Sequence, residues 1–160
     1  MNTTPKAVVP TLYEWAGGME KFEAWTDLFY QRVKEDAVLA PVFAGMSADH
    51  ARHVAHFIAE VFHGPAKYST EEGSHYEMIH HHLGKHLTEG QRQRWIGLIL
   101  DTADVIGLPD DPEFRSALVG YLEWGSRLAV INSKAGVVSE QVDATMPSWG
   151  WGETGGPYIP

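Results

Sequence analysis

The segment HHHLGKHLTEGQRQRW, residues 80–95, is the most informative part of this chain. It begins with three consecutive histidines and ends on Trp95. Between them, Thr88-x-x-Gln91 is a capping box, in which the two side chains satisfy free backbone N–H groups at a helix start. The stretch therefore sets several imidazoles directly before a predicted helix that carries an aromatic ring near its beginning.

Every histidine of the chain lies around this stretch. All nine fall between His50 and His86, and the chain has no cysteine. The lack of cysteine excludes disulfides, thiolate metal ligands, a cysteine nucleophile and covalent c-type haem attachment. The local enrichment indicates that the middle of the chain uses imidazole.

Hydrophobic periodicity predicts an all-α domain around the histidines. In residues 19–34, Phe22, Trp25, Phe29 and Val33 recur at spacings of three and four, which is typical of one helical face. No segment predicts a strand pair, and Gly and Pro break the helices too often for a bundle of long rods. The main helices are predicted over residues 19–34, 47–62 (after an N-cap at Ser47), 75–82, 88–106 and 111–134.

Length and composition fit one soluble domain. The 160 residues carry 12 basic and 21 acidic side chains, a net charge of −9, and the basic residues are scattered. Nucleic-acid binding needs a basic patch, so we do not expect it. The start of the chain has no apolar signal core and no apolar run reaches membrane-spanning length. We expect a cytoplasmic protein without membrane contact.

The ends of the chain differ from its middle. Residues 1–10 are expected to form a leader, residues 11–134 the domain, and residues 135–160 a Gly-, Pro- and Trp-rich tail without helix. Exposed tryptophan is unfavourable, so Trp149 and Trp151 predict that the tail lies against the body.

The residues alone leave four interpretations of the histidine window open. The histidines are bystanders; they form a Zn or Ni site, with His50, His53 and His56 or His82 and His86 at helical spacings; they hold haem; or the domain is a helical sensor or interaction module without a cofactor. Haem needs one imidazole against an apolar pocket, and composition does not choose which one. Candidate walls are Phe29, Phe43, Val54, Phe57 and Trp95, and candidate polar groups are Tyr30, His50 and the Trp95 N–H.

Five segments, in order and at family spacings, resemble the truncated haemoglobins, the two-over-two globins, and specifically their group II. The resemblance covers roughly residues 11–133 and implies a two-over-two helical sandwich around a haem. The matching segments are YEWAGG, DLFYQRV, LAPVF, VFHGPAKYS, and HHHLGKHLT followed by Trp95.

The resemblance implies that His82 binds the iron. In the family the proximal histidine lies thirteen residues before the tryptophan and five before a Leu or Ile, and both counts select His82, from Trp95 and from Leu87. A register slip of one residue would select His81 instead.

The family's distal positions fall on Tyr30, Trp95 and Phe43, the last often tyrosine in group II. His50 falls on the distal gate, which is often small, and Val54 lies one turn further in. His50 is expected to donate to a bound ligand, to act as a gate, to bind iron as a sixth ligand, or to point to solvent.

Two further departures concern charge and backbone. His53 and His81 stand where Arg or Lys often pair with the haem propionates, with Arg52, Lys67 and Tyr68 as nearby alternatives, and a histidine partner would make the pairing pH-dependent. His63-Gly64 replaces a family Gly-Gly, and a non-glycine residue is restricted at positive φ.

The resemblance implies a b-type haem protein that binds O₂, CO and NO reversibly, for O₂ transport or storage. Peroxidase chemistry with peroxide, or NO dioxygenation with an unknown reductase, is the alternative, with His50 as acid or base. A His-rich, non-haem metal-binding helical protein is the outside alternative. A monomer or a homodimer is expected.

Overall fold

The computed structural model describes residues 8–82, 84–134 and 145–160, so the leader residues 1–7 and the tail residues 135–144 lie outside the described part. Within that part the secondary structure is helical, with no strand. The prediction of an all-α fold is thus confirmed. The elements are α1 (Leu12–Ala16), α2 (Met19–Glu35), α3 (His50–Val61), the π-helical turn η1 (Tyr68–Glu72), α4 (His75–His80), α5 (Glu89–Ile106), α6 (Pro112–Asn132) and the 3₁₀ turn η2 (Gly152–Thr154).

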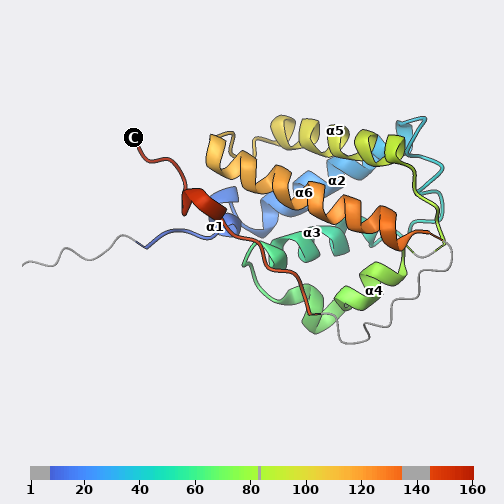
Figure 1. Ribbon diagram of the computed structural model, residues 1–160, viewed down its shortest axis with the longest axis horizontal. Helices are drawn as coiled ribbons and strands as arrows, with labels where there is room; N and C mark the ends of the chain where they lie inside the picture. Colours follow the sequence, from blue (N-terminus) through green and yellow to red (C-terminus); the bar gives the residue numbers. More distant parts are fainter. Residues whose placement is uncertain (1–7, 83, 135–144) are drawn as a thin grey trace, which may run out of the picture.

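The long helices form two packed pairs. α2 packs on α3, α5 packs on α6, and α2 also packs on α5, which joins the pairs (Figure 1). The short helix α4 lies at the edge of this arrangement, next to the end of α6. The segment that carries His82 is therefore peripheral, whereas the walls around it are long helices.

Local signals explain where several helices begin and end. Thr88 and Gln91 form the predicted capping box of α5, and Asp111 accepts from the Phe114 N–H at the start of α6. Gly107 ends α5 in the left-handed region with φ 80°, which glycine adopts without strain. These ends agree with the sequence-based boundaries.

Other boundaries differ from the prediction. The N-cap of α3 is Asp49 rather than Ser47, because the carbonyl of Ser47 accepts from the His50 N–H in a separate turn. α4 ends at His80, so His82 lies just beyond the helix. Residues 68–72, expected as a loop, form the π-helical turn η1.

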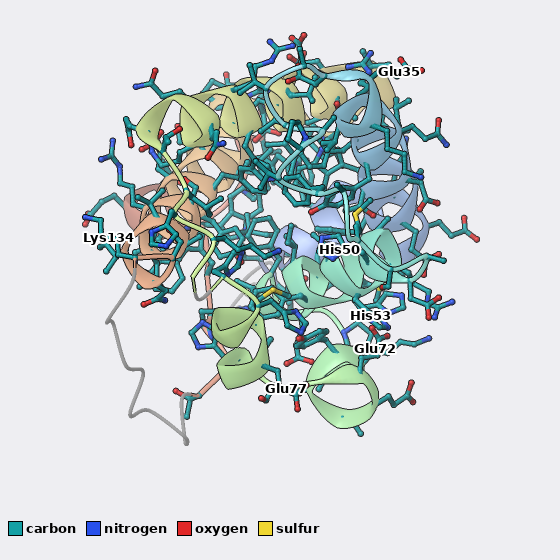
Figure 2. The ribbon with its side chains drawn as sticks, turned by 90° about the vertical axis from the view of Figure 1, so that its right-hand side faces the viewer. Glu35, His50, His53, Glu72, Glu77 and Lys134 are labelled. Atoms are coloured by element: carbon teal, nitrogen blue, oxygen red, sulfur yellow. The ribbon has the colours of Figure 1, made fainter. Side chains whose placement is uncertain are left out.

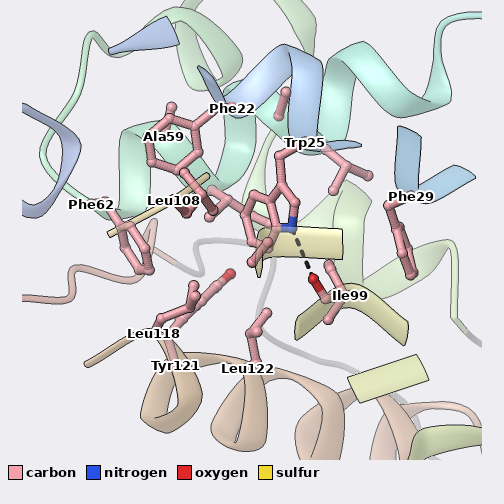
Figure 3. Close-up of a cluster of buried hydrophobic side chains, with 14 of the residues drawn as sticks. Phe22, Trp25, Phe29, Ala59, Phe62, Ile99, Leu108, Leu118, Tyr121 and Leu122 are labelled. Carbon is pink, nitrogen blue, oxygen red and sulfur yellow. Dashed lines mark hydrogen bonds between the residues drawn. The ribbon is translucent and has the colours of Figure 1, made fainter. Parts of the chain in front are cut away.

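The core lies between the two pairs (Figure 3). Trp25 is fully buried, and its indole N–H donates to the Ile99 carbonyl across 2.9 Å. Phe22 and Phe62 pack edge to face, with ring centroids 6.0 Å apart. This bond and these rings fix α2 against both α5 and α3.

Residues 145–151, called the C-terminal strap below, lie along the body. The Trp149 N–H donates to the Val61 carbonyl (2.9 Å), and the Trp151 indole donates to the Pro10 carbonyl (2.8 Å). Figure 1 shows the strap running from beside α4, past α3 and α6, to α1. None of the described helices has the length and apolar character that crossing a bilayer requires.

Candidate functional site

A cavity opens between the helix pairs and the segment that follows α4. About 190 Å³ lies inside it, whereas one water molecule requires only ~10–15 Å³. Its walls are mostly apolar, with a few imidazoles and other polar groups. This is the composition expected of a binding site for a large, mainly apolar ligand. The lining includes Tyr30, Phe43, His50, Val54, Phe57, His75, Met78, His81, His82, Lys85, Trp95, Trp124 and Pro147.

His82 reaches the cavity from the turn after α4. Burial above all, together with the charges of Lys85 and His81, lowers its pKa to about 4, and a hydrogen bond to the backbone of Met78 opposes this shift. The imidazole is therefore neutral at pH 7. With one nitrogen donating to the Met78 carbonyl, the other keeps its lone pair, the arrangement that metal-binding histidines use.

His50, the first residue of α3, also lines the cavity. Its ring lies edge-on to Tyr30, with centroids 4.8 Å apart, and 6.0 Å from Phe43. Burial above all lowers its pKa to about 4, and the nearby Lys85 and other histidines add to the effect. Its Nε2 atom is buried without a hydrogen-bond partner. A buried polar atom without a partner is costly, so this nitrogen is suited to a ligand inside the cavity.

Tyr30 and Trp95 bring two hydrogen-bond donors to the same cavity. Tyr30, on α2, is only 4% exposed, and burial raises the pKa of its hydroxyl, while a hydrogen bond with the Trp95 side chain opposes that shift. The Trp95 ring packs edge-on against Phe29, 5.8 Å between centroids. α2 and α5 thus hold an O–H and an N–H side by side at the cavity wall.

A tight turn after α2 positions Phe43. The Asp36 carboxylate accepts from the N–H groups of Val38 and Leu39, each at 3.0 Å, and from Arg94 Nε at 2.6 Å. The Arg94 guanidinium holds the pKa of Asp36 below its usual range. Phe43 then packs against Tyr30, with centroids 5.6 Å apart.

Two residues expected near the cofactor do not line the cavity. His53 Nε2 lies 3.5 Å from Glu72 Oε2, and Figure 2 shows the two residues beside each other, away from His50. Tyr68 is buried against Phe57 (5.1 Å), and its hydroxyl donates to the Ser74 carbonyl (3.4 Å). Their roles at the propionates stay predictions, as does that of His81, which is exposed at the cavity rim.

The sequence left the backbone geometry of the His63-Gly64 turn in doubt, because a non-glycine residue is restricted at positive φ. His63 adopts φ 71° in the left-handed region, and its Nε2 shares a hydrogen bond of 2.7 Å with the Ser148 hydroxyl. A Cβ on Gly64 would approach the Ala59 carbonyl to 2.7 Å, so glycine is required there. One glycine of the pair is thus replaced and the other is not replaceable.

The structure gives His56, which the sequence named only as a candidate metal ligand, a different setting, and it adds His75 and Pro147 to the cavity. His56 is 1% exposed, and its two ring nitrogens contact the carboxylates of Glu23 (2.8 Å) and Glu72. His75 lines the cavity and precedes His82 by seven residues. This helical spacing could have indicated from the sequence that the two histidines share a face. Pro147 also lines the cavity, and no sequence pattern points to it. Among the described residues, no group of three or more His, Asp or Glu side chains is arranged to hold a metal ion.

Comparisons with known proteins assign the chain to a family. Residues 11–123 match the family model of the bacterial-like globins. The group 2 truncated haemoglobin YjbI of Bacillus subtilis is 31% identical over 118 residues, 74% of this chain and 87% of the relative.

Solved structures agree. The truncated oxygen-avid haemoglobin from Bacillus subtilis is 30% identical, with a TM-score of 0.66. The similarity covers 76% of this chain and 99% of that protein. The haemoglobin of the thermophilic phototrophic bacterium Chloroflexus aurantiacus is 28% identical, also with a TM-score of 0.66. The similarity covers 75% of this chain and 97% of that protein.

With its helix pairs and its apolar cavity lined by several imidazoles, the chain belongs to the bacterial-like globins. More narrowly, it is a truncated haemoglobin of group II, with the two-over-two fold that its sequence predicted. The family implies a haem and a small diatomic ligand. The cavity fits that group, because it combines apolar walls, a neutral imidazole at His82 and an unpartnered nitrogen at His50.

Proposed function

We propose that this protein binds a b-type haem through His82 and uses it to bind O₂, CO and NO reversibly, in O₂ storage or transport. The observation that supports the proposal best is that His82 and His50 enter one apolar cavity as neutral imidazoles, and that Nε2 of His50 has no partner in the protein. When bound, the haem supplies an iron atom that accepts a diatomic ligand at its sixth coordination position.

The side chains around the cavity have separate tasks in this proposal. His82 would hold the haem iron, and the backbone of Met78 would orient its ring. Tyr30 and Trp95 would donate hydrogen bonds to bound O₂, which carries partial negative charge, with His50 as a third donor. Phe43, Val54 and Phe57 would exclude water and pack against the porphyrin.

The propionates need partners at the cavity rim. The proposed partners are His81, at the rim, and His53, which lies outside the lining beside Glu72. Lys85, which lines the cavity, is a further basic group nearby.

Absorption spectroscopy tests the proposal. Purified protein reconstituted with haem should give a sharp Soret band that shifts when CO is added to the ferrous form. His82→Ala should lose that spectrum, whereas His81→Ala should keep it, because His81 is exposed at the rim. A free-haem spectrum in the wild type would contradict the proposal. If only His81→Ala lost the Soret spectrum, the iron-binding residue would be His81 rather than His82.

A haem enzyme is the second candidate. Peroxidase chemistry needs a distal base, and the neutral, unpartnered His50 is suited to accept a proton. Peroxide turnover that is lost in His50→Leu, with a normal Soret band, would support this function. NO dioxygenation would need a reductase partner, and the sequence carries no flavin or nicotinamide fingerprint. We further propose a cytoplasmic protein that is a monomer or a homodimer.

A further inference from the structure

The C-terminal strap is anchored to the long helices at several points. Its Trp149 N–H donates to Val61 at the end of α3, and its Ser148 hydroxyl bonds the His63 ring in the next turn. The Trp149 indole packs against Tyr121 (5.8 Å) and Trp124 (5.9 Å) of α6. A Cβ at Gly120 would meet that indole at 3.4 Å, so α6 is hollowed where the ring lies.

The strap also reaches the functional cavity. Pro147 is part of the cavity lining, and its neighbour Met146 packs against the core. His75, at the start of α4, lines the same cavity, and its ring interacts with the backbone of Thr145. The first turn of α4 and the beginning of the strap are therefore side by side, as Figure 1 also shows.

The other end of the His82 segment is held by the residue that follows α6. Ser133 is fully buried, and its carbonyl accepts from the His86 N–H while its hydroxyl accepts from the Leu87 N–H, both at 2.9 Å. His86 has φ 49°, a left-handed conformation that a non-glycine residue adopts only when its surroundings hold it. These bonds supply that support four residues beyond His82.

Ser133 and the strap thus contact both ends of the segment from His75 to Leu87, and both lie beyond residue 123, where the match to the globin family model ends. α4 has only six residues and is too short to be stable without such contacts. The segment that carries His82 is therefore contacted at both ends by chain beyond residue 123.

We propose that Ser133 and residues 145–149 of the C-terminal strap form a frame that positions the His82 segment and closes the cavity beside it, so that the frame determines how long haem is retained. The inference rests on the proposed function, since it concerns the same His82 site. Trp149 and Ser133 are positioning residues in this frame, and Pro147 is a wall of the cavity.

Haem loss from the full-length, haem-loaded protein tests the frame. Ferric protein is mixed with excess apomyoglobin as a haem acceptor, and the transfer is followed by absorbance. Trp149→Ala should lose haem about tenfold faster than the wild type or more. Trp151→Phe is the matched control, because it removes the bond to Pro10 near α1, away from the cavity, and it should stay within about twofold. Wild-type retention in Trp149→Ala would overturn the proposal.

A second readout separates positioning from general stability. The iron–histidine stretching band of the ferrous protein, measured by resonance Raman, should broaden or shift in Trp149→Ala and in Ser133→Ala. Trp15→Phe removes the indole hydrogen bond to Asp111 (2.8 Å), and neither residue belongs to the frame. This variant serves as a destabilised control, and its iron–histidine band should stay at the wild-type position. If Trp15→Phe loses haem as fast as the frame variants at matched thermal stability of the apoprotein, the frame has no special role and the proposal is wrong.

A smaller change guards against misfolding of Trp149→Ala. Ser148→Ala keeps the indole and removes only the bond to His63, and we expect an intermediate rate of haem loss. A rate equal to wild type in Ser148→Ala and Ser133→Ala together would overturn the frame. If the wild type itself takes up no haem stoichiometrically, the proposed function fails instead, so the two failures are distinguishable.

Discussion

His50 and His82 show how burial determines whether a histidine side chain is protonated. Each would be about half protonated near pH 6.5 in water. In the protein, apolar neighbours lower both pKa values to about 4. The free-energy cost of keeping both imidazoles unprotonated is therefore small at pH 7 and increases as the pH falls.

The first prediction concerns His50 in the apoprotein. A folded pKa near 4 and an unfolded pKa near 6.5 mean that the unfolded chain binds more protons between these values. Stability should fall as the pH drops from about 6.5 towards 4, with a slope of up to about 1.4 kcal/mol per pH unit from this one group. Urea unfolding of His50→Leu should show a shallower pH dependence. Tyr30→Phe, which removes a hydroxyl from the same pocket, should keep the wild-type slope.

The second prediction concerns Trp95. Replacing it with phenylalanine removes the indole N–H and keeps an aromatic wall. A hydrogen bond to a charged ligand atom contributes about 1.5–3 kcal/mol, so O₂ dissociation should be about 10- to 100-fold faster in Trp95→Phe. Stopped-flow measurement of the O₂ off-rate tests this. Trp124→Phe, at another tryptophan of the cavity lining, is the control, and an equal acceleration there would refute a specific role for Trp95.

At this scale the sequence predicted the cavity better than it predicted its surroundings. Four of the expected apolar walls and three of the named imidazoles line the cavity, because periodicity determines which face of a helix is inward: Phe43, Val54, Phe57 and Trp95, with His50, His81 and His82. Phe29, also expected as a wall, is buried in the core instead. His53 and Tyr68 are elsewhere, since η1 brings Glu72 to His53, and a π-helical turn has no clear sequence signal. The sequence named His56 only as a candidate metal ligand. Its contacts with Glu23 and Glu72 were not predicted, because these partners come from other elements.

Among the elements, η1 is attached to the helix pairs through His56. This buried ring contacts Glu23 of α2 and Glu72 of η1 with its two nitrogens, and carboxylates only accept hydrogen bonds. The contacts join α2, α3 and η1 at one point.

The third prediction follows from this connection. Glu72→Gln keeps the shape but removes a charge next to a buried imidazole, and it should lower the free energy of unfolding by about 1–3 kcal/mol. Chemical denaturation measures the change. Glu71→Gln, at the exposed neighbouring position, should change stability by less than about 0.5 kcal/mol. Equal effects of both variants would show that His56 does not hold η1.

Helix positions were predictable where the end signals are local, and less so elsewhere. The capping box at Thr88 and the Asp111 cap act within three residues, so the sequence alone located α5 and α6. The start of α3 was placed at Ser47 because serine is a good N-cap, but the turn from Phe43 to Met46 directs the chain first. The path of the strap depends on Val61, His63 and Tyr121, which no local pattern reveals.

For the whole molecule, the fourth prediction concerns the loss of haem. A ligand that binds only the native state stabilises it by an amount that grows with ligand concentration over Kd. The apoprotein should therefore melt at a lower temperature than the haem-loaded protein, and the difference should shrink in His82→Ala. Differential scanning calorimetry measures both forms. Equal melting temperatures in the wild type would contradict haem binding to the folded cavity.

The bond between Trp151 and Pro10 spans 141 residues of sequence. Contacts between such distant residues form slowly, because the chain loses much entropy in closing so long a loop. We expect the helix pairs to assemble first and the strap to dock last, as a separate kinetic phase. In a chain leaving the ribosome, the cavity would then stand open until residues 145–151 have emerged and docked, which gives the cofactor a period to enter before the strap covers that side.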